Sequence, residues 1–320
     1  MASLQVIGVG AMNMDYFYRV KSLLKDGEAK VEEVQTFPGG SAANTIYALA
    51  KLGISCGFVG AVGGDETGQR VAEDLKQAGV DTKFIATKAD AKTGSVVALV
   101  DDAGHRALYV HQGANGLLNK SDLNSSYLNS AQIVHTSAFV GEKQFLCQRD
   151  LLPALAPNIK LSFAPGALYS KRGLENLKPI LERTFILFLN RQELKELAGA
   201  DPITGALRCI QTGCQMVVAT LGKGLRRGSN TYSCLVAQAN NVTWVPVASG
   251  VKHVVDTTGA GDAFTAGFLY GCLMQKPAEE CALLGDLTAG FCIAKLGART
   301  GLPDKSELEN AYHQATGHGI

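Results

Sequence analysis

Residues 256–269, DTTGAGDAFTAGFL, place an aspartate directly after a glycine-rich loop and at the start of an apolar segment. The backbone N–H groups in the first turn of a helix have no partner within the helix, and the helix dipole adds to their attraction for anions. Gly259, Ala260 and Gly261 have side chains too small to cover these groups, so they could bind a phosphoryl group. Asp262 then has two interpretations, which the loop alone leaves open: it complements the helix dipole, or it performs chemistry.

Two other glycine-rich loops do not match the familiar nucleotide-binding motifs. The dinucleotide motif GxGxxG fails after the first strand-like run, because Asn13 occupies the position of the third glycine. A Walker A loop requires Ser or Thr after its Gly-Lys pair, but Lys223 is followed by Gly224. A hydride-transfer enzyme and a P-loop enzyme are therefore disfavoured.

The composition indicates a globular protein with one sizeable core. Hydrophobic residues make up 46% of the 320 residues, and 30 Lys and Arg against 29 Asp and Glu leave a net charge of +1. This balance lacks the basicity that binding to a nucleic-acid backbone requires. The eight cysteines form no CxxC pair, which favours free thiols in a reducing compartment over a zinc site. Because neither a basic leader nor an apolar run near the roughly 20 residues that span a bilayer is visible, we expect a cytoplasmic protein without a membrane partner.

Strand-like and helix-like segments alternate along most of the chain. The first units are a strand over residues 4–9, a helix over 41–52 with Ser41 as its N-cap, and a strand over 54–59. This alternation predicts βαβ units, and therefore a mainly parallel sheet covered by helices. Further helices are expected over residues 66–78, 191–197, 260–274 and 278–296, and further strands over 132–136, 159–163, 185–189 and 216–220.

Two segments depart from this alternation and predict a second, smaller sheet. Residues 15–35 have a mixed pattern typical of exposed strands, and residues 94–100 and 106–111 flank the turn-like sequence DDAG at 101–104. We expect the segments at about 14–37 and 93–112 to form a small antiparallel β lid beside the main sheet. Because no linker or repeat is visible, the chain is predicted to be a single α/β domain over residues 1–320.

The sequence resembles the ribokinase-like (PfkB) family of sugar and nucleoside kinases in two signatures. DTTGAGDAFTAGFL is similar to the C-terminal signature of that family, and GGSAANTIYALAKLG at residues 39–53 is similar to its N-terminal signature. Shorter matches occur at Asp15, 190–193, 220–224 and 297–298. The resemblance implies a ribokinase-like α/β fold, with a central, mostly parallel sheet flanked by helices and a small β-sheet lid over the substrate.

The resemblance also implies a phosphotransferase with an alcohol group as acceptor, which moves the γ-phosphoryl group of ATP to the primary hydroxyl of a sugar or nucleoside. Asp262 would be the general base that takes the proton from this hydroxyl, and the loop at 259–261 would form the anion hole for the phosphoryl group. These roles suit phosphoryl transfer, which depends mainly on positioning and on stabilising negative charge. Asp256 and Thr258 either order the loop before the helix or, as in some relatives, lie near a monovalent cation such as K⁺.

The nucleotide and metal positions follow from the same resemblance, and each has a structural alternative. Asn190 and Glu193 have the spacing of a helix capping box. The resemblance implies that Asn190 lies near the nucleotide phosphates. It also implies that Glu193 helps to bind Mg²⁺, commonly through water. Thr220, Gly222 and Gly224 could form only a turn, but in the family they border the phosphates and ribose of ATP.

The acceptor would bind at Asp15, Gly39, Gly40 and Asn44, which grip sugar hydroxyls in the family. Paired glycines allow a close approach of the backbone, and the Asp and Asn side chains can bind neighbouring hydroxyls. Taken alone, the two glycines form a turn, and Asn44 is a polar residue in a first helical turn. Ribokinases proper carry a lysine soon after the paired glycines, and this chain has none there, so the sequence leans towards a nucleoside of the adenosine type.

Three questions stay open at the level of the sequence. Tyr16, Phe17 and Phe139 could stack on a base or simply pack in the core or lid. A kinase of the ribose or fructose type is an alternative, and so is a catalytically silent sugar- or nucleotide-binding regulator, although the retained Asp262 and glycine loop favour an enzyme. Exposed strands of the lid could also pair two chains into a homodimer.

Overall fold

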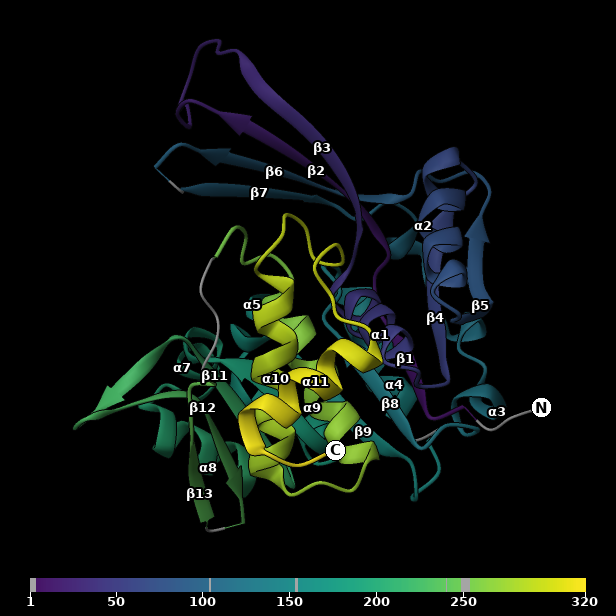
Figure 1. Ribbon diagram of the computed structural model, residues 1–320. Helices are drawn as coiled ribbons and strands as arrows, with labels where there is room; N and C mark the ends of the chain where they lie inside the picture. The colour runs from purple at the N-terminus through teal and green to yellow at the C-terminus, as the bar shows by residue number, and fades with distance from the viewer. Residues whose placement is uncertain (1–3, 104, 153–154, 240, 249–253) are drawn as a thin grey trace.

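The computed structural model describes residues 4–103, 105–152, 155–239, 241–248 and 254–320. Over these residues the chain forms a large sheet with the strand order β13-β12-β11-β10-β9-β8-β1-β4-β5 and a separate small sheet (Figure 1). From β5 to β11 all neighbouring strands of the large sheet are parallel, while β12 and β13 are antiparallel additions at one edge. The predicted mostly parallel sheet is therefore confirmed. Its strands are β1 (Val6–Val9), β4 (Cys56–Gly63), β5 (Asp81–Lys88), β8 (Ile133–Ser137), β9 (Lys160–Ala164), β10 (Thr184–Asn190), β11 (Met216–Arg227), β12 (Asn230–Gln238) and β13 (Asn241–Pro246).

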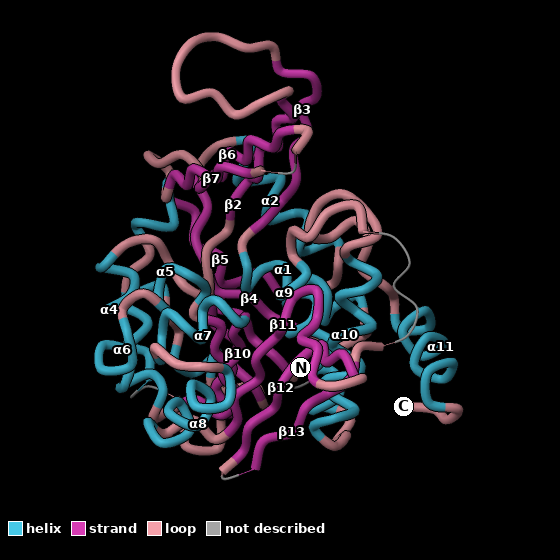
Figure 2. Tube along the Cα trace, turned by 90° about the vertical axis from the view of Figure 1, so that its left-hand side faces the viewer, coloured by secondary structure: helices cyan, strands magenta, loops and turns pink. Residues whose placement is uncertain are grey.

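Helices cover both faces of the large sheet, as Figure 2 shows from the side. Side chains of a strand alternate between the two faces, so in β10 Ile186 and Phe188 belong to one apolar core, and Leu187 and Leu189 to the other. The first core is covered by α1 (Ser41–Lys51), α2 (Glu66–Gln77), α9 (Ala260–Leu273), α10 (Ala278–Cys292) and α11 (Lys305–Thr316). The second is covered by α3 (Ser125–Leu128), α4 (Glu142–Leu151), α5 (Gly166–Ser170), α6 (Gly173–Leu181), α7 (Arg191–Ala198) and α8 (Pro202–Thr212).

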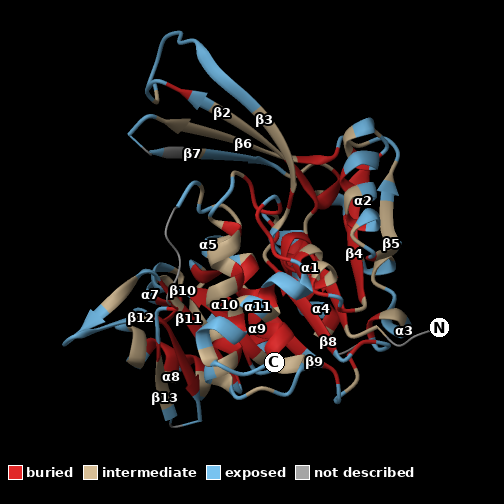
Figure 3. Ribbon diagram, in the orientation of Figure 1, coloured by how far each residue is buried: buried red, intermediate tan, exposed pale blue. Residues whose placement is uncertain are grey.

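Burial on both faces explains the apolar strand runs in the sequence. All four residues of β1 are buried, which is why this strand is a continuous apolar run and does not alternate with polar residues. Figure 3 shows the buried residues gathered between the sheet and its helices, while most of the projecting part of the small sheet is exposed or intermediate. The large sheet is therefore a rigid base, and its strand ends can hold functional groups.

The small sheet projects from one end of the large one (Figure 1) and has the order β3-β2-β6-β7. Its strands β2 (Asn13–Val20), β3 (Val31–Gly39), β6 (Gly94–Asp101) and β7 (Arg106–His111) come from the two predicted segments. A wholly antiparallel sheet was the wrong expectation, because β2 pairs with β6 in parallel. Between these two strands the chain returns along β3, passes through α1, β4, α2 and β5, and so enters both strands from the same end. Gly104 of the predicted turn lies outside the described residues, and action of this sheet as a lid stays a prediction.

The ends of four predicted helices differ by one residue from those observed, and two further features also differ. The N-cap of α1 is Gly40 and not Ser41, which is the first helical residue. Gly40 has φ +105°, a conformation that favours glycine. α10 ends at Cys292 and not at residue 296. The carbonyl of Ile293 accepts a hydrogen bond from the backbone N of Val255 at 2.8 Å, which ties the end of this helix to the loop before α9.

The cysteines are free, as the sequence indicates, and six of the eight are buried. Burial raises the pKa of the Cys209 thiol to about 12, so that this side chain acts as a small apolar group. In the part of the chain that the structure describes, no helix combines the length and the apolar character that crossing a bilayer requires.

Candidate active site

The predicted catalytic loop leads into the N-terminus of α9. Gly259 is the N-cap with a left-handed φ of +76°, and a Cβ at this position would overlap with Ala298. Gly259 therefore has a structural reason to be glycine. Gly261 differs, because a Cβ there would meet no atom of the other described parts of the chain within 4 Å, and the residue lines a cavity. Since the N–H of Ala260 donates to the carbonyl of Thr257 at 3.2 Å, Gly261 is the part of the loop best placed to receive a ligand.

Three residues of α1 hold Asp262 at the start of α9. Ser41 Oγ donates to Oδ1 of Asp262 at 2.7 Å, and Asn44 Nδ2 donates to Oδ2 at 2.9 Å. Thr45 Oγ1 donates to the backbone carbonyl of Asp262 at 3.3 Å. Burial raises the pKa of the Asp262 carboxyl, while the hydrogen bonds from Ser41 and Asn44 and the positive charge of Arg299 act in the opposite direction. The carboxylate is thus held in one orientation and made more basic than an exposed aspartate.

A cavity of about 110 Å³ beside Asp262 brings together most of the residues predicted for the nucleotide end. Gly261 and Asp262 line it from α9, Asn190 and Glu193 from the junction of β10 and α7, and Thr220 from β11. Asn190 and Thr220 are register partners on neighbouring parallel strands. The carboxyl ends of such strands meet at one edge of the sheet, where α/β proteins bind ligands.

The Asn190–Glu193 element forms the capping box that its spacing predicts. The Asn190 side chain accepts hydrogen bonds from the backbone N–H groups of Gln192 and Glu193, and the Glu193 carboxylate accepts one from Asn190 N at 2.9 Å. Burial raises the pKa of Glu193, and the negative charges of Asp262 and Glu196 raise this pKa further. The hydrogen bond from the Asn190 backbone lowers it in part. The two carboxylates of Glu193 and Asp262 therefore repel each other across one cavity, a repulsion that a bound cation would relieve.

The residues present fit a Mg²⁺ ion that reaches the protein mainly through phosphates and water. Among the described residues no cluster of three or more His, Cys, Asp or Glu could enclose a metal. Magnesium usually keeps several waters and binds one or two carboxylates together with the phosphates of the substrate. One carboxylate at Glu193, in the same cavity as the N-terminus of α9, is consistent with that mode of binding.

The other residues predicted for the nucleotide and for a cation are not among those that line this cavity. Gly222 and Gly224 have φ +63° and +93°, where the register between β11 and β12 shifts. Asp256 Oδ1 accepts hydrogen bonds from N and Oγ1 of Thr258 at 2.9 and 2.8 Å, and Oδ2 accepts one from Gly297 N at 2.9 Å. These bonds match the loop-ordering interpretation of Asp256 and Thr258; a monovalent cation there stays a prediction.

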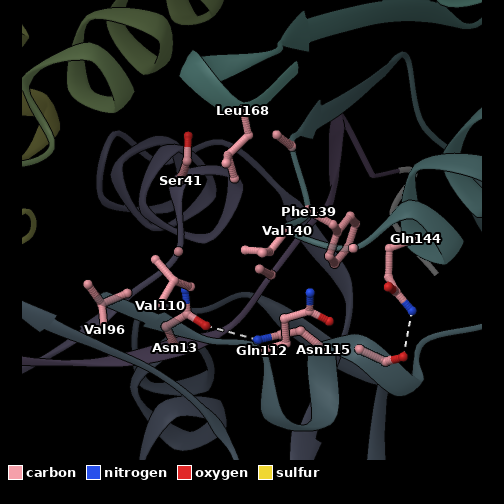
Figure 4. Close-up of a pocket in the computed structure, with 15 residues that line it drawn as sticks. Asn13, Ser41, Val96, Val110, Gln112, Asn115, Phe139, Val140, Gln144 and Leu168 are labelled. Atoms are coloured by element: carbon pink, nitrogen blue, oxygen red, sulfur yellow. Dashed lines mark hydrogen bonds between the residues drawn. The ribbon is translucent and has the colours of Figure 1, made fainter. Parts of the chain in front are cut away.

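A second cavity, of about 140 Å³, lies between the small sheet and the large one (Figure 4). Ser41 lines both cavities and its hydroxyl is bonded to Asp262. The two cavities therefore share Ser41 as part of their walls, and the carboxylate that lines the first cavity is bonded to this shared residue. The described residues that line the second cavity include no charged side chain; they combine the amides of Asn13, Gln112, Asn115 and Gln144 with apolar groups of Val96, Val110, Phe139, Val140 and Leu168.

The four residues predicted to bind the acceptor have different places. Gly40 lines the second cavity, while Asp15, Gly39 and Asn44 are not among its lining residues. Asp15 Oδ1 is buried without a hydrogen-bond partner in the described part of the chain, and a Cβ on Gly39 would collide with this carboxyl group. Burial raises the pKa of Asp15 to about 6, against the positive charge of Arg299. A buried carboxylate oxygen of this kind is suited to accept a hydrogen bond from a ligand hydroxyl.

The three aromatic candidates are also separated. Phe139 is 2% exposed and packs with Ala61 and Ala114, and it lines the second cavity. Tyr16 lines a different, open cavity on the other side of the small sheet. Phe17 lies on β2 and lines neither of the two cavities that meet at Ser41. Of the three, Phe139 is the one with access to the second cavity.

Some residues that shape the two cavities or contact Asp262 and Asn44 were missed at the level of the sequence. Ser41 was interpreted only as a cap, although its hydroxyl bonds to Asp262. Arg299 was not considered, yet its Nε donates to Asn44 Oδ1 at 2.9 Å and its guanidinium pairs with Asp74. The sequence contained one indication of Arg299: it is a basic residue directly after Gly297 and Ala298, which match the ribokinase-like family. The amides of the second cavity had a weaker signal, in the polar sequence QGAN at 112–115.

Comparisons with known proteins identify the family of the chain and its fold. The family model for pfkB family carbohydrate kinases matches residues 3–305. A protein of Archaeoglobus fulgidus named as an uncharacterized sugar kinase is 36% identical over 256 residues, which are 80% of this chain and 98% of that protein. A nucleoside kinase of Methanothermobacter thermautotrophicus is 26% identical over 98% of this chain and 97% of its own length. The solved structure of Arabidopsis thaliana ribokinase with ribose and ATP superposes with a TM-score of 0.82 at 24% identity, covering 97% of this chain and 99% of that one.

Proposed function

Because the chain belongs to the pfkB family of carbohydrate kinases, which are phosphotransferases with an alcohol group as acceptor, we propose that it transfers the γ-phosphoryl group of ATP to the primary hydroxyl of a neutral sugar or nucleoside. One observation carries the proposal. Ser41 lines both cavities, and its hydroxyl is bonded to the Asp262 carboxylate, which lines the first of them. A phosphoryl group in one cavity and a hydroxyl in the other would therefore face each other beside this carboxylate.

Asp262 acts as the general base of the reaction. Burial makes its carboxylate more basic, and hydrogen bonds from Ser41 and Asn44 keep it oriented. When the acceptor hydroxyl attacks the phosphorus atom, its proton passes to this carboxylate. Positioned bases of this kind contribute about 10² to 10⁴-fold in rate.

The N-terminus of α9 stabilises the charge that spreads over the transferring phosphoryl group. The positive end of the helix dipole faces the cavity at Gly261, which leaves room for a phosphoryl oxygen. Asn190 and Thr220 border the nucleotide phosphates from the opposite wall. Glu193 would hold Mg²⁺ through water, and the ion would neutralise part of the phosphate charge. Gly222 and Gly224 are proposed to border the ATP beyond Thr220.

The second cavity supports a neutral acceptor. Its lining residues offer amide donors and acceptors and no charged side chain, so a phosphorylated sugar would have no counter-charge there. Asp15 is not among the residues that line this cavity, but its buried oxygen has no partner in the described part of the chain, and we propose that it binds a hydroxyl of the acceptor. Hydrogen-bonding amides beside Phe139 suit a nucleobase, and a relative of similar length is a nucleoside kinase. We therefore place a nucleoside first and a sugar of the ribose or fructose type second.

A screen for ADP release tests the proposal. The protein is incubated with ATP and Mg²⁺ and with ribose, fructose, adenosine, inosine, cytidine or a sugar phosphate in turn. We expect turnover with at least one unphosphorylated acceptor and none with the sugar phosphates. Silence across the panel, together with thermal stabilisation by the same ligands, would instead identify a binding regulator.

A further inference from the structure

Arg299 is a buried cation that lines neither cavity. Its side chain is 7% exposed, and it lies in the segment between α10 and α11. A buried charge is costly unless it is paired and hydrogen-bonded. The carboxylate of Asp74 on α2 pairs with Nη1, and the ring of Tyr47 on α1 lies 5.1 Å from the guanidinium carbon. These contacts explain how the charge is tolerated, but they leave the other donors of the guanidinium to be explained.

The remaining donors face the predicted acceptor residues. Arg299 Nε donates to Asn44 Oδ1 at 2.9 Å, and Nη2 donates to the Gly39 carbonyl at 3.3 Å. Arginine can only donate, whereas an asparagine amide has one accepting and one donating end. The oxygen of the Asn44 amide must therefore point to Arg299. Its nitrogen then points the other way, to Oδ2 of Asp262, with which it makes a 2.9 Å hydrogen bond.

We propose that Arg299 is a positioning residue for phosphoryl transfer, which acts on the base Asp262 by fixing the orientation of the Asn44 amide. The proposal rests on the proposed function, because it presumes that Asp262 is the base. Without the guanidinium, the Asn44 oxygen loses its donor, and only the bond from its nitrogen to Asp262 Oδ2 still orients the amide. The amide, and with it the Asp262 carboxylate, would then be held less firmly in the position that the reaction requires.

The alternative is that Arg299 only stabilises the fold through Asp74. A double-mutant cycle separates the two roles, because residues that act through each other give non-additive effects. The variants Arg299→Met, Asn44→Ala and the double variant are purified, and kcat/KM for the acceptor and the melting temperature are measured for each. We expect Arg299→Met to lower kcat/KM by about 10²-fold in the wild-type background, the order of loss that a displacement of about 1 Å causes. In the Asn44→Ala background, where no amide is left to orient, we expect less than about a 3-fold loss.

A matched control is Arg183→Met. Arg183 Nη2 donates to the carbonyls of Ala156 and Ile159 at 2.8 and 2.9 Å, at the opposite end of β10 from Asn190. This variant should lose stability and keep kcat/KM within about 2-fold. An equal loss of kcat/KM from Arg299→Met in both Asn44 backgrounds would overturn the proposal. Inactive wild type would instead refute the proposed function, so the two failures are distinguishable.

Arg299→Lys covers the case in which the Met variant does not fold. Lysine keeps the charge that faces Asp74, but a single ammonium group cannot serve the three positions that the guanidinium occupies. We expect a folded protein with kcat/KM lowered by about 10-fold, and less than about a 2-fold difference in the Asn44→Ala background. Turnover of Arg299→Lys within 2-fold of the wild type would overturn the proposal.

Discussion

Replacement of Asp15 by asparagine should stabilise the protein at neutral pH while weakening acceptor binding. Burial raises the pKa of Asp15 from 3.8 to about 6; the charge of Arg299 opposes this shift, and that of Asp262 adds to it. The folded protein therefore binds a proton at Asp15 more tightly than the unfolded chain does. Between pH 3.8 and 6 the folded state holds more protons, so the contribution of Asp15 to stability falls as the pH rises through this range.

The size of the effect follows from the two pKa values. At about 1.4 kcal/mol per pH unit, the interval between 3.8 and about 6 corresponds to about 3 kcal/mol of destabilisation once Asp15 is ionised. About half of this penalty is present at pH 5. Asparagine has the same shape without the charge. Its buried amide costs about 1–3 kcal/mol if it finds no partner, but that cost is the same at every pH. The diagnostic quantity is therefore the change with pH in the difference between the two proteins.

Urea unfolding of the wild type and Asp15→Asn at pH 5, 6, 7 and 8 measures the difference in their free energies of unfolding. Titrating groups that the two proteins share contribute equally to both values and cancel in this difference. We expect the variant to gain about 1–2 kcal/mol over the wild type between pH 5 and 8. Asp201→Asn is a suitable control, since hydrogen bonds from Thr204 hold the pKa of that N-cap carboxyl below its usual range. Its difference from the wild type should be constant over the same interval. A constant difference for Asp15→Asn as well would refute the reasoning. In the kinetic assay, the KM for the acceptor should rise for Asp15→Asn and stay unchanged for Asp201→Asn.

Four further substitutions test the site. Asp262→Asn should fold and bind the acceptor but turn over at least about 10²-fold more slowly; in the wild type, kcat should fall as the pH drops, because the base must be ionised and burial raises its pKa. Gly261→Ala should keep the melting temperature but weaken turnover, since its methyl group meets no protein atom and enters the cavity, whereas Gly259→Ala should lose stability through its φ of +76° and its contact with Ala298. Glu193→Gln should require more Mg²⁺ for half-maximal turnover, with less change in acceptor KM; an unchanged Mg²⁺ titration would contradict its role.

Local patterns predicted the parts of the site that depend on neighbouring residues. The capping box at Asn190 and Glu193 involves residues three apart, and the structure forms it as the spacing indicates. The strand-helix alternation was likewise sufficient for a parallel sheet, because buried parallel strands carry continuous apolar runs. The parallel pairing of β2 with β6 was not predictable in this way, since it depends on the path of the chain between the two strands.

The errors at α1 and α10 arise from contacts that are distant in the sequence. Serine is a common N-cap, but the entry into α1 is set by Gly40 at φ +105°, and the Ser41 hydroxyl bonds to a residue 221 positions away. Arg299 bonds to Gly39 and Asn44 over separations of 260 and 255 residues. No local periodicity contains this information, and only the packing of α1, α9 and the segment after α10 brings these groups together.

The glycines of the DTTGAGDAFTAGFL segment serve two purposes, which the structure separates. Gly267 and Gly271 lie deeper in α9, where a Cβ would overlap with the Leu284 carbonyl and with Cys281 of α10. Because these two residues have no side chains, α9 and α10 can approach closely. Dense packing of this kind resists displacement of one helix relative to the other. Gly261 has open space at its Cβ position. The same helix is therefore held rigidly along its length and left uncovered at its N-terminus, and a preorganised site for a phosphoryl group requires both properties.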